Sequence, residues 1–311
     1  MEILAACPAY AATGGPEALH QFVSELNKLD GIDAKIWYWD YAGGDPEPDE
    51  YKAYKCEYVT QLPEDYTGAL VLPEIYASRI EDFPCGVKAI YWLGLDAYPM
   101  WTPPGMRGAF LDDEEILHIV QSEYARDFLE TMGVKRIVKC GDLLNEDFFA
   151  VYEEKERDDA VLYNPAKATA FMHRLMGECH GITFKPIKGM TRQEVIDAMH
   201  SAKLYVDFGE FPGRERMPRE AVASGCCIIT SRIGSAAQYG DFPHTYKFES
   251  KDGHIWAINY MIRHVLEHYE ECRKDFDHFR KELSNERDLY REQIEDVARA
   301  LDEVQHNHTG V

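Results

Sequence analysis

The sequence predicts an α/β protein made of two successive domains, each built on a doubly wound parallel sheet. A length of 311 residues allows about two domains, each large enough to bury a core. Short apolar runs alternate with segments whose apolar residues recur at helical spacing, which is the pattern of βαβ units. The alternation stops at an acidic stretch near the middle of the chain and then begins again, which indicates a second domain.

The first domain opens with a βαβ unit. Residues 3–7 form a short apolar run, a Gly14-Gly15-Pro16 turn follows, and an amphipathic helix is predicted over 16–29. A second strand is predicted over 34–39, and the short connections imply that the two strands are parallel. Further strands are predicted at 69–72, 87–93 and 117–121, the last followed by a helix that Ser122 caps and Gly133 ends.

The acidic, non-periodic stretch 142–159 separates the domains, and the boundary is placed between 148 and 149. The second domain is predicted to contain strands at 161–163, 182–187, 204–207 and 227–230, with helices opening at Pro165, Thr191 and Pro218. Thr191 and Glu194 have the spacing of a capping box. From about 254 to 304 the chain is charged and helical, which predicts two long helices, and we expect the segment 286–305 to pack back on the first domain.

Charge and cysteine content narrow the class of protein. The formal net charge is −22, which disfavours nucleic acid and anionic membranes as partners but still permits a local phosphate pocket. The eight cysteines are scattered without a Cys-x-x-Cys pair, as in a cytoplasmic protein with reduced thiols and no zinc site. No apolar stretch approaches the roughly 20 residues of a membrane-spanning helix, and the first residues lack the features of a signal peptide. The sequence leaves the oligomeric state open.

The most informative stretch leaves the strand that ends at Asp207, crosses a Gly/Pro loop and enters a helix. The loop and helix start carry Arg214, Arg216 and Arg219 in an otherwise acidic chain. A helix N-terminus offers unpaired amides and a partial positive charge, and arginines add charge-assisted hydrogen bonds, so this segment suits a phosphate group. The alternative is that the arginines pair with neighbouring acids as a surface charge lattice, and local sequence does not separate the two.

This stretch resembles the donor-binding region of GT-B nucleotide-sugar glycosyltransferases, especially the retaining superfamily. The matching pieces are the Arg219-Glu220-Ala221-Val222-Ala223-Ser224-Gly225 helix, the Pro212-Gly213-Arg214-Glu215-Arg216-Met217-Pro218 loop, Gly14-Gly15-Pro16, Asn164-Pro165-Ala166-Lys167 and Gly234-Ser235-Ala236-Ala237. The resemblance covers most of residues 1–248 and implies two Rossmann-like domains facing a cleft. Because 311 residues are few for two full domains of this kind, we expect the first to be trimmed to its essential strands.

The resemblance implies roles for particular residues. Glu220 corresponds to the glutamate that accepts hydrogen bonds from the donor ribose, and Lys167 to a basic residue at the diphosphate, where Arg216 is a further catalytic candidate. Gly14 and Gly15 would allow the donor or acceptor to approach the backbone closely. The remaining residues expected in the donor site are Asn164, Glu210, Arg214, Arg219, Gly234 and Ser235.

Asp96 follows a predicted strand of the first domain, at the kind of position where α/β proteins bind ligands. It is therefore a candidate for contact with an acceptor hydroxyl. The alternative interpretation is that it only caps a turn. His20 has the same two interpretations, as a residue of the site or as a structural histidine of the first helix.

The resemblance implies a metal-independent transfer of a hexosyl unit from a UDP- or GDP-sugar to a glycan or small hydroxyl acceptor, with no cofactor besides the donor. Within the family a first glutamate precedes the second at a fixed spacing, and Pro212 stands at that position here. This departure keeps two alternatives open. One is a catalytically inactive protein that binds a nucleotide sugar or acts as a scaffold, and the other is a nucleotide-sugar epimerase or hydrolase.

Two further motif matches do not carry a prediction, and two well-known motifs are absent. His264 and His268 fit an inverted zinc-protease pattern but lie in a charged helical segment. Asp275-Phe276-Asp277 resembles a metal-binding Asp-x-Asp but is also expected in a helix. Neither a dinucleotide-binding Gly-x-Gly-x-x-Gly nor a P-loop is present, which argues against nicotinamide oxidoreductases and P-loop kinases.

Overall fold

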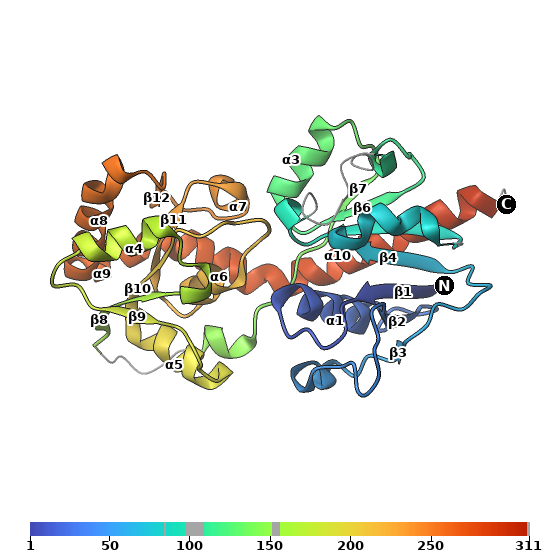
Figure 1. Cartoon of the computed structure of the whole chain (residues 1–311), viewed down its shortest axis with the longest axis horizontal. Coiled ribbons are helices and arrows are strands. Elements are labelled where there is room, and N and C mark those ends of the chain that lie inside the picture. The colour runs from blue at the N-terminus through green and yellow to red at the C-terminus, as the bar shows by residue number, and fades with distance from the viewer. Residues whose placement is uncertain (84, 98–108, 151–155, 310–311) are drawn as a thin grey trace. The chain divides into compact units, whose positions relative to one another are not determined.

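The computed structural model describes residues 1–83, 85–97, 109–150 and 156–309. The chain divides into two compact units, one formed by Met1–Leu143 with Arg287–Val311 and the other by Leu144–Glu286. Each unit is an α/β structure on its own parallel sheet, which confirms the predicted fold class (Figure 1). The units divide after 143 and after 286, whereas the sequence placed one boundary after 148.

The first unit holds a seven-stranded parallel sheet in the order β3-β2-β1-β4-β5-β6-β7. Its strands are β1 (Glu2–Cys7), β2 (Asp33–Tyr38), β3 (Tyr58–Val59), β4 (Ala69–Pro73), β5 (Val87–Trp92), β6 (Leu117–Val120) and β7 (Ile137–Lys139). Helix α1 (Gly14–Leu26) follows β1, and α3 (Glu123–Thr131) follows β6 and is capped by Ser122 as predicted. This sheet has more strands than that of the second unit, and the expectation of a first domain trimmed relative to the family stays a prediction.

Strand β1 is buried on both faces. Ile3, Ala5 and Cys7 belong to one hydrophobic cluster, and the alternate residues Leu4 and Ala6 belong to another. A central parallel strand covered on both sides has no solvent-facing positions, so it reads as a continuous apolar run. This is why the sequence located β1 without any period-2 alternation.

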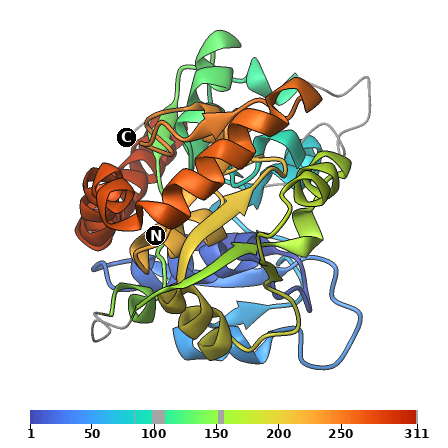
Figure 2. The same ribbon diagram turned by 90° about the vertical axis from the view of Figure 1, so that its left-hand side faces the viewer.

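The second unit holds a five-stranded parallel sheet in the order β12-β11-β10-β8-β9. Its strands are β8 (Asp158–Tyr163), β9 (Phe184–Pro186), β10 (Ala202–Asp207), β11 (Cys227–Ser231) and β12 (Lys247–Phe248). Its helices are α4 (Ala170–Glu178), α5 (Arg192–Ser201), α6 (Arg216–Ala223), α7 (Gly234–Ala237), α8 (Ile255–Glu267) and α9 (Tyr269–Cys272). Helices α4 and α8 pack together, as do α5 and α6, and Figure 2 faces this unit with α8 in orange near the viewer.

Two helix starts in this unit differ from the prediction. Pro165 opens only the short 3-10 turn η6 (Pro165–Lys167), and α4 begins after Thr169, whose side chain accepts a hydrogen bond from Met172 N. Helix α6 begins at Arg216 instead of Pro218. Proline is tolerated in the first turn because the N–H it lacks would have no partner within the helix. The capping box of Thr191 and Glu194 is confirmed.

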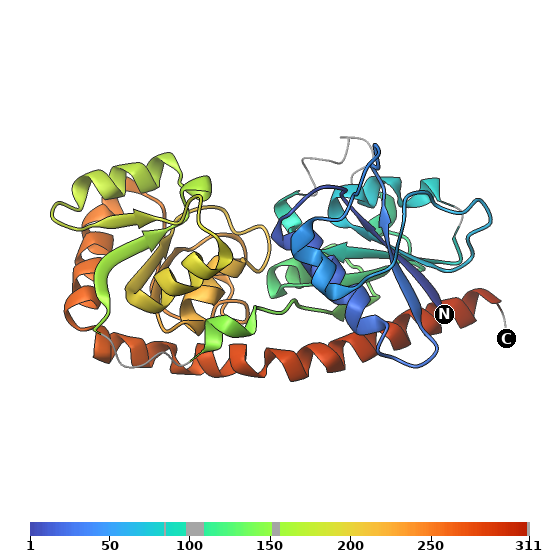
Figure 3. The ribbon, with the colours of Figure 1, turned by 90° about the horizontal axis from the view of Figure 1, so that it is seen from below.

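The chain ends in α10 (Asp277–Thr309), which Figure 3 shows as one continuous helix. Residues 287 onward belong to the first unit, where Gln293 Oε1 accepts a hydrogen bond of 2.8 Å from Gly141 N. The two long helices predicted for the C-terminal region are α8, of 13 residues, and α10, of 33. The side chains of α10 in the first unit's core recur every three or four positions: Tyr290, Ile294, Val297, Leu301 and Val304.

Among the helices of the described ranges, none combines the length and the apolar composition that crossing a bilayer requires.

Candidate functional site

The second sheet reverses its winding direction between β8 and β10. From β8 the chain adds β9 on one side and then crosses over to add β10, β11 and β12 on the other. In doubly wound sheets, ligands bind at the carboxyl ends of the two strands where this reversal occurs. Lys167 follows the carboxyl end of β8, and Asp207 is the last residue of β10. The topology therefore places the predicted Lys167 at the position where a ligand is expected.

The segments that follow β8 and β10 pack closely against each other. A Cβ added at Gly209 would lie 3.0 Å from Lys167 Cβ and 3.0 Å from Asp207 Oδ1, so a larger residue would not fit without a shift. Asn164 shapes the turn that carries Lys167, because its side chain accepts a hydrogen bond of 3.0 Å from Ala166 N. Two predicted donor-site residues, Asn164 and Lys167, are thus held beside β10.

Asp207 is a buried carboxylic acid that the sequence analysis did not assign to the site. Its Oδ1 accepts a hydrogen bond of 2.9 Å from Gly209 N, and its Oδ2 accepts one of 3.0 Å from the Tyr205 hydroxyl. Burial raises the pKa of Asp207 to about 6, against the opposing effects of the Gly209 N–H and the Lys167 charge. A polar residue at the end of a buried strand was the available signal for it.

The loop between β10 and α6 is held by residues that follow β11. Ser235 donates from its backbone N–H to Phe211 O at 2.9 Å, and from its hydroxyl to Gly213 O. Gly234 has a φ of +51°, and a Cβ there would lie 2.1 Å from Phe211 O. Ser235 is fully buried. We therefore revise the predicted role of Gly234 and Ser235 from donor contact to support of this loop.

Arg219 holds the same loop from within the unit. Its side chain is fully buried; Nε donates to Glu215 O at 3.2 Å and Nη2 to Arg214 O at 2.9 Å. Its Nη1 lies 3.4 Å from Glu286 Oε2. A guanidinium with no exposed surface cannot touch a ligand without moving, so the prediction that Arg219 binds the donor directly is revised to a positioning role.

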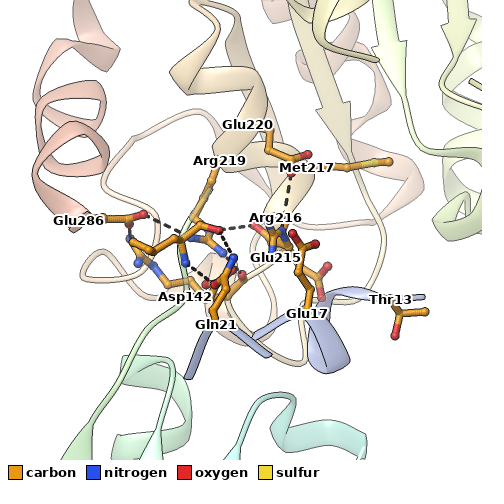
Figure 4. Close-up of polar contacts among 12 residues, drawn as sticks. Thr13, Glu17, Gln21, Asp142, Glu215, Arg216, Met217, Arg219, Glu220 and Glu286 are labelled. Carbon is orange, nitrogen blue, oxygen red and sulfur yellow. Dashed lines mark hydrogen bonds and ion pairs between the residues drawn. The ribbon is translucent and has the colours of Figure 1, made fainter. Parts of the chain in front are cut away.

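Arg216 is the first residue of α6 (Figure 4), and Arg214 lies two residues before it in the loop. Arg214 Nη2 is 2.6 Å from Glu286 Oε1, and Arg216 Nε is 3.7 Å from Glu220 Oε1 one turn along the helix. The backbone N–H groups of the first helical turn have no acceptor within the helix, and the helix dipole adds positive potential there. The structure thus pairs both arginines with carboxylates near the start of α6, and a phosphate site there stays a prediction.

Two acids of the loop differ in their surroundings. Glu210 is exposed, at the start of the loop. The carboxylate of Glu215 forms an ion pair with the ammonium of Lys167. The structure therefore brings two acids, Asp207 and Glu215, close to Lys167. The sequence analysis gave neither of them a role.

The predicted residues of the first unit lie around the corresponding reversal point of its own sheet, between β1 and β4. Helix α1 begins at Gly14, directly after the β1 loop. A Cβ at Gly15 would lie 3.7 Å from Leu93 Cδ1, an ordinary contact, so packing alone does not require glycine there. Asp96 lies in the 3-10 turn η3 (Leu95–Ala97) and accepts a hydrogen bond of 2.9 Å from the Tyr124 hydroxyl.

Glu74 is a second buried acid that the sequence analysis missed. It follows β4, and its carboxylate accepts hydrogen bonds from Leu93 N at 2.9 Å and from Gly94 N at 3.1 Å. Its side chain is 4% exposed, and burial raises its pKa to about 7. Through these hydrogen bonds, Glu74 links the carboxyl end of β4 to the residues that follow β5 and lead to Asp96.

His20 is structural. It is fully buried, with Nδ1 2.7 Å from Pro16 O and Nε2 2.9 Å from the Tyr38 hydroxyl, and burial lowers its pKa. Over the described ranges, no group of three or more His, Cys, Asp or Glu is arranged to hold a metal ion. Asp275 instead accepts a hydrogen bond of 2.6 Å from the Tyr246 hydroxyl.

A large open cavity of about 1630 Å³ lies at the other edge of the second sheet. Its lining includes Asp158 and Lys203, at the amino ends of β8 and β10, and Ser224 and Gly225, just beyond the end of α6. Both cationic and acidic residues line it, and Arg157 there already donates to the carbonyl groups of Ala202 and Ser224. Because ligands of doubly wound sheets bind at the carboxyl ends of strands, we place the site at Lys167 and not in this cavity.

Comparisons with known proteins agree with this fold. No family model matches the chain. Over 140 residues it is 28% identical to an alpha-1,6-glucosyltransferase of Actinobacillus pleuropneumoniae serotype 7 (strain AP76), a match that covers 42% of this chain and 42% of that relative.

Two solved structures match nearly the whole chain. Sucrose-phosphate synthase from Thermosynechococcus elongatus superposes with a TM-score of 0.67 at 14% identity, over 97% of this chain and 99% of that one. Anabaena HepE in complex with UDP superposes with a TM-score of 0.65 at 12% identity, over 97% and 100%, and HepE has also been solved with UDP-glucose. At this level of identity the likeness concerns the fold, and the chain has the GT-B fold of nucleotide-sugar glycosyltransferases.

Proposed function

We propose that this chain is a glycosyltransferase that moves a hexosyl unit from a UDP- or GDP-sugar to a glycan or a small hydroxyl acceptor. The observation that carries the proposal is the cluster of Lys167, Arg214 and Arg216 at the reversal point of the second sheet. Cations gathered at that point in a chain of net charge −22 suit an anionic ligand. The partial relative is named a glucosyltransferase and HepE was solved with UDP-glucose, so UDP-glucose is the first donor to test.

The reaction requires stabilisation of the departing nucleoside diphosphate, which gains negative charge as the sugar leaves. In the proposed mechanism Lys167, Arg216 and the first N–H groups of α6 are aimed at this diphosphate, and Glu220 accepts hydrogen bonds from the ribose. Fixed donors placed where charge develops are typically worth about 10²–10³ in rate each. Glu220 lies beside Arg216, so ribose and diphosphate contacts would come from adjacent turns of one helix.

The acceptor side is proposed for the first unit, with Gly14 and Gly15 near the acceptor or donor and Asp96 on an acceptor hydroxyl. The proposed chemistry uses cationic side chains where other glycosyltransferases use a metal ion, so activity is expected to survive EDTA. We also propose that the reaction takes place in the cytoplasm, on the basis of eight free cysteines.

Nucleotide binding by the purified protein tests the proposal. Calorimetric titration with UDP, GDP and uridine is compared among the wild type, Lys167→Ala, Arg216→Ala and the control Lys281→Ala. The control removes the same charge from an exposed residue at the opposite cavity. We expect the site variants to bind the diphosphate about tenfold more weakly and uridine equally well, with the control unchanged. Equal losses for UDP and uridine would refute the phosphate assignment, and failure of the wild type to bind any nucleotide would refute the donor site.

Turnover separates the enzyme from its main alternative. Pro212 replaces the first glutamate of the family's pair, which favours a protein that binds a nucleotide sugar without transferring it. Slow release of UDP from UDP-glucose in the absence of acceptor supports the transferase. Thermal stabilisation by UDP-glucose without any turnover supports the binding protein, and interconversion of the sugar supports an epimerase.

A further inference from the structure

We propose that Tyr10, in the loop between β1 and α1, is a binding residue of the acceptor side, where its ring packs against one face of an acceptor sugar. The inference rests on the proposed function, because it concerns the acceptor of the same reaction. Tyr10 follows the carboxyl end of β1, beside the point where the first sheet reverses its winding direction. The local sequence does not distinguish it from the other tyrosines of the chain.

The backbone of Tyr10 is strained. Its φ is +61°, in the left-handed region, where a side chain crowds the backbone. Among the non-glycine residues of the described ranges, only Lys55 also has a positive φ, and Lys55 ends the 3-10 turn η1 (Asp49–Tyr54). Tyr10 ends no helix, and glycine or asparagine is the usual residue at a positive φ in a turn. Strained residues of this kind gather at binding and active sites, where the surrounding structure holds them.

The loop that follows β2 holds Tyr10 at both ends. The backbone N–H of Tyr10 donates to Pro46 O at 2.8 Å. Its hydroxyl donates to Gly43 O at 2.6 Å and accepts a hydrogen bond of 3.0 Å from Ala42 N. The ring is thus fixed between two anchors, so it has little further freedom to lose when a ligand binds.

Tyr10 is nonetheless 47% exposed. The one polar atom of its side chain already has a donor and an acceptor partner, so the surface left for a ligand is the carbon surface of the ring. Tyr38 and Tyr91 of the same unit are instead fully buried in its core. A rigid, exposed aromatic ring at the carboxyl edge of a parallel sheet therefore suits ligand binding better than packing.

A hexose ring offers the complementary surface. Its hydroxyl groups lie mainly around the rim, and several C–H groups gather on one face. These hydrogens pack favourably on the electron-rich face of an aromatic ring. Asp96 is proposed to contact an acceptor hydroxyl, and Tyr10 adds the apolar contact that orients the sugar ring. Acceptors that contain a sugar ring are therefore preferred over acceptors that offer hydroxyl groups alone.

The test measures the binding of methyl β-glucoside and methyl β-galactoside to the protein saturated with UDP, by saturation-transfer NMR. In the wild type we expect the strongest saturation on the ring hydrogens of one sugar face. Glycerol, which has hydroxyl groups but no ring, should show no saturation.

Tyr10→Gly removes the ring and leaves a residue that adopts the same φ without strain. We expect it to bind the preferred glycoside about three- to tenfold more weakly, with UDP affinity unchanged. The control is Tyr260→Ala, which removes a ring that is 67% exposed on α8 of the second unit. This control should match the wild type for both ligands.

Tyr10→Phe separates the ring from its anchor. It keeps the aromatic face and loses the hydrogen bonds to Gly43 and Ala42, so we expect it to bind the glycoside more tightly than Tyr10→Gly does. Should Tyr10→Gly unfold the protein, Tyr10→Asn takes its place with the same expectation, because asparagine also tolerates a positive φ.

Several results would overturn the inference while leaving the donor site intact. They are wild-type glycoside affinity in Tyr10→Gly or its replacement, a Tyr10→Phe variant that binds no better than Tyr10→Gly, or a wild type that binds UDP but neither glycoside. A parallel loss of UDP affinity in Tyr10→Gly would assign the effect to general disruption and also counts against it. A wild type that binds no nucleotide would instead remove the proposed function on which the inference rests.

Discussion

The carboxylate of Glu215 contacts the ammonium of Lys167, so the lysine proposed to hold a diphosphate is already paired with an acid of the neighbouring loop. Both groups retain some exposure, 33% for Lys167 and 19% for Glu215, so the pair is open to a ligand. A phosphate group of the ligand and the Glu215 carboxylate would compete for the ammonium of Lys167. We therefore expect Glu215 to influence the affinity of the proposed site for a phosphate group.

The first prediction is that Glu215→Gln strengthens binding of UDP. Removing the carboxylate frees Lys167 from a partly exposed ion pair, whose loss is worth up to about 1 kcal/mol or roughly fivefold in affinity. Uridine should bind as it does to the wild type. Calorimetry with both ligands checks this, with Glu267→Gln, exposed on α8, as the charge-matched control. Weaker UDP binding by Glu215→Gln would show that Glu215 orients Lys167 instead of competing for it.

The second prediction concerns pH and Asp207. Its pKa is raised to about 6 by burial, so this acid gains a proton as the pH falls from about 8 to about 5, and a negative charge near Lys167 disappears. Wild-type affinity for UDP-glucose should therefore rise over this range, by several-fold. The diphosphate of UDP-glucose keeps its charge over this pH range. A terminal phosphate would not, because its second pKa is about 6.

Asp207→Asn provides the comparison for that experiment. It removes the charge at every pH, so its affinity profile should be flatter than that of the wild type. Parallel profiles for the two proteins would assign the pH dependence to another group and contradict the prediction.

The third prediction is that Gly234→Ala destabilises the protein. The residue combines a φ of +51° with a Cβ position 2.1 Å from the Phe211 carbonyl oxygen, so alanine would force the loop away. We expect the free energy of unfolding to fall by about 2–4 kcal/mol, from backbone strain and overpacking together. Chemical denaturation followed by circular dichroism measures this change.

Gly177→Ala is the matched control for Gly234→Ala. Gly177 lies inside α4, and a Cβ there would have no neighbour within 4 Å. Alanine at a helical site is favoured over glycine by roughly 0.5–1 kcal/mol, so this variant should be more stable than the wild type. Similar effects of the two substitutions would mean that the contact with Phe211 does not constrain the loop.

The fourth prediction concerns the buried Glu74. Its pKa rises from 4.5 to about 7 on folding, so the folded state binds more protons than the unfolded state between these values. Stability from this group is therefore fully present below about pH 4.5 and lost as the pH rises through about 7. Its size is on the order of 3 kcal/mol, at 1.36 kcal/mol per pKa unit.

Comparison with Glu74→Gln isolates that contribution. The difference in unfolding free energy between wild type and variant, measured by denaturation at several pH values, should shift in favour of the wild type as the pH falls. Because the other acids are common to both proteins, their titration cancels. A difference that does not change with pH would contradict the burial of an ionisable group at this position.

The parts of the fold that could be predicted carry a local signal. β1 is a continuous apolar run, Ser122 is a helix cap, and Thr191 with Glu194 is a capping box. β3, β7 and β12 were not predicted, because strands of two or three residues are too short to show any periodicity. The start of α6 was misplaced because a proline permits a helix to begin at several nearby positions.

The candidate site likewise has residues that could be predicted from the sequence and features that depend on the folded structure. The local sequence indicated that the loop and helix start with Arg214 and Arg216 suit a phosphate group, and only the resemblance to GT-B glycosyltransferases implied donor-site roles for Lys167 and Glu220. It could not indicate that Arg219 is buried, which follows from its packing within the unit.

The partners of these cations come from the folded arrangement. Glu215 meets Lys167 because β8 and β10 are neighbours in a sheet whose order differs from the order of the chain. Glu286 meets Arg214 because α10 reaches the loop from a distant part of the sequence. Contacts of this kind depend on strand order and helix packing, on which the spacing of residues along the chain carries no information. The amino-acid pattern thus predicted the fold class and the cationic side chains of the candidate site. Long-range packing determined which acidic side chains pair with those cations.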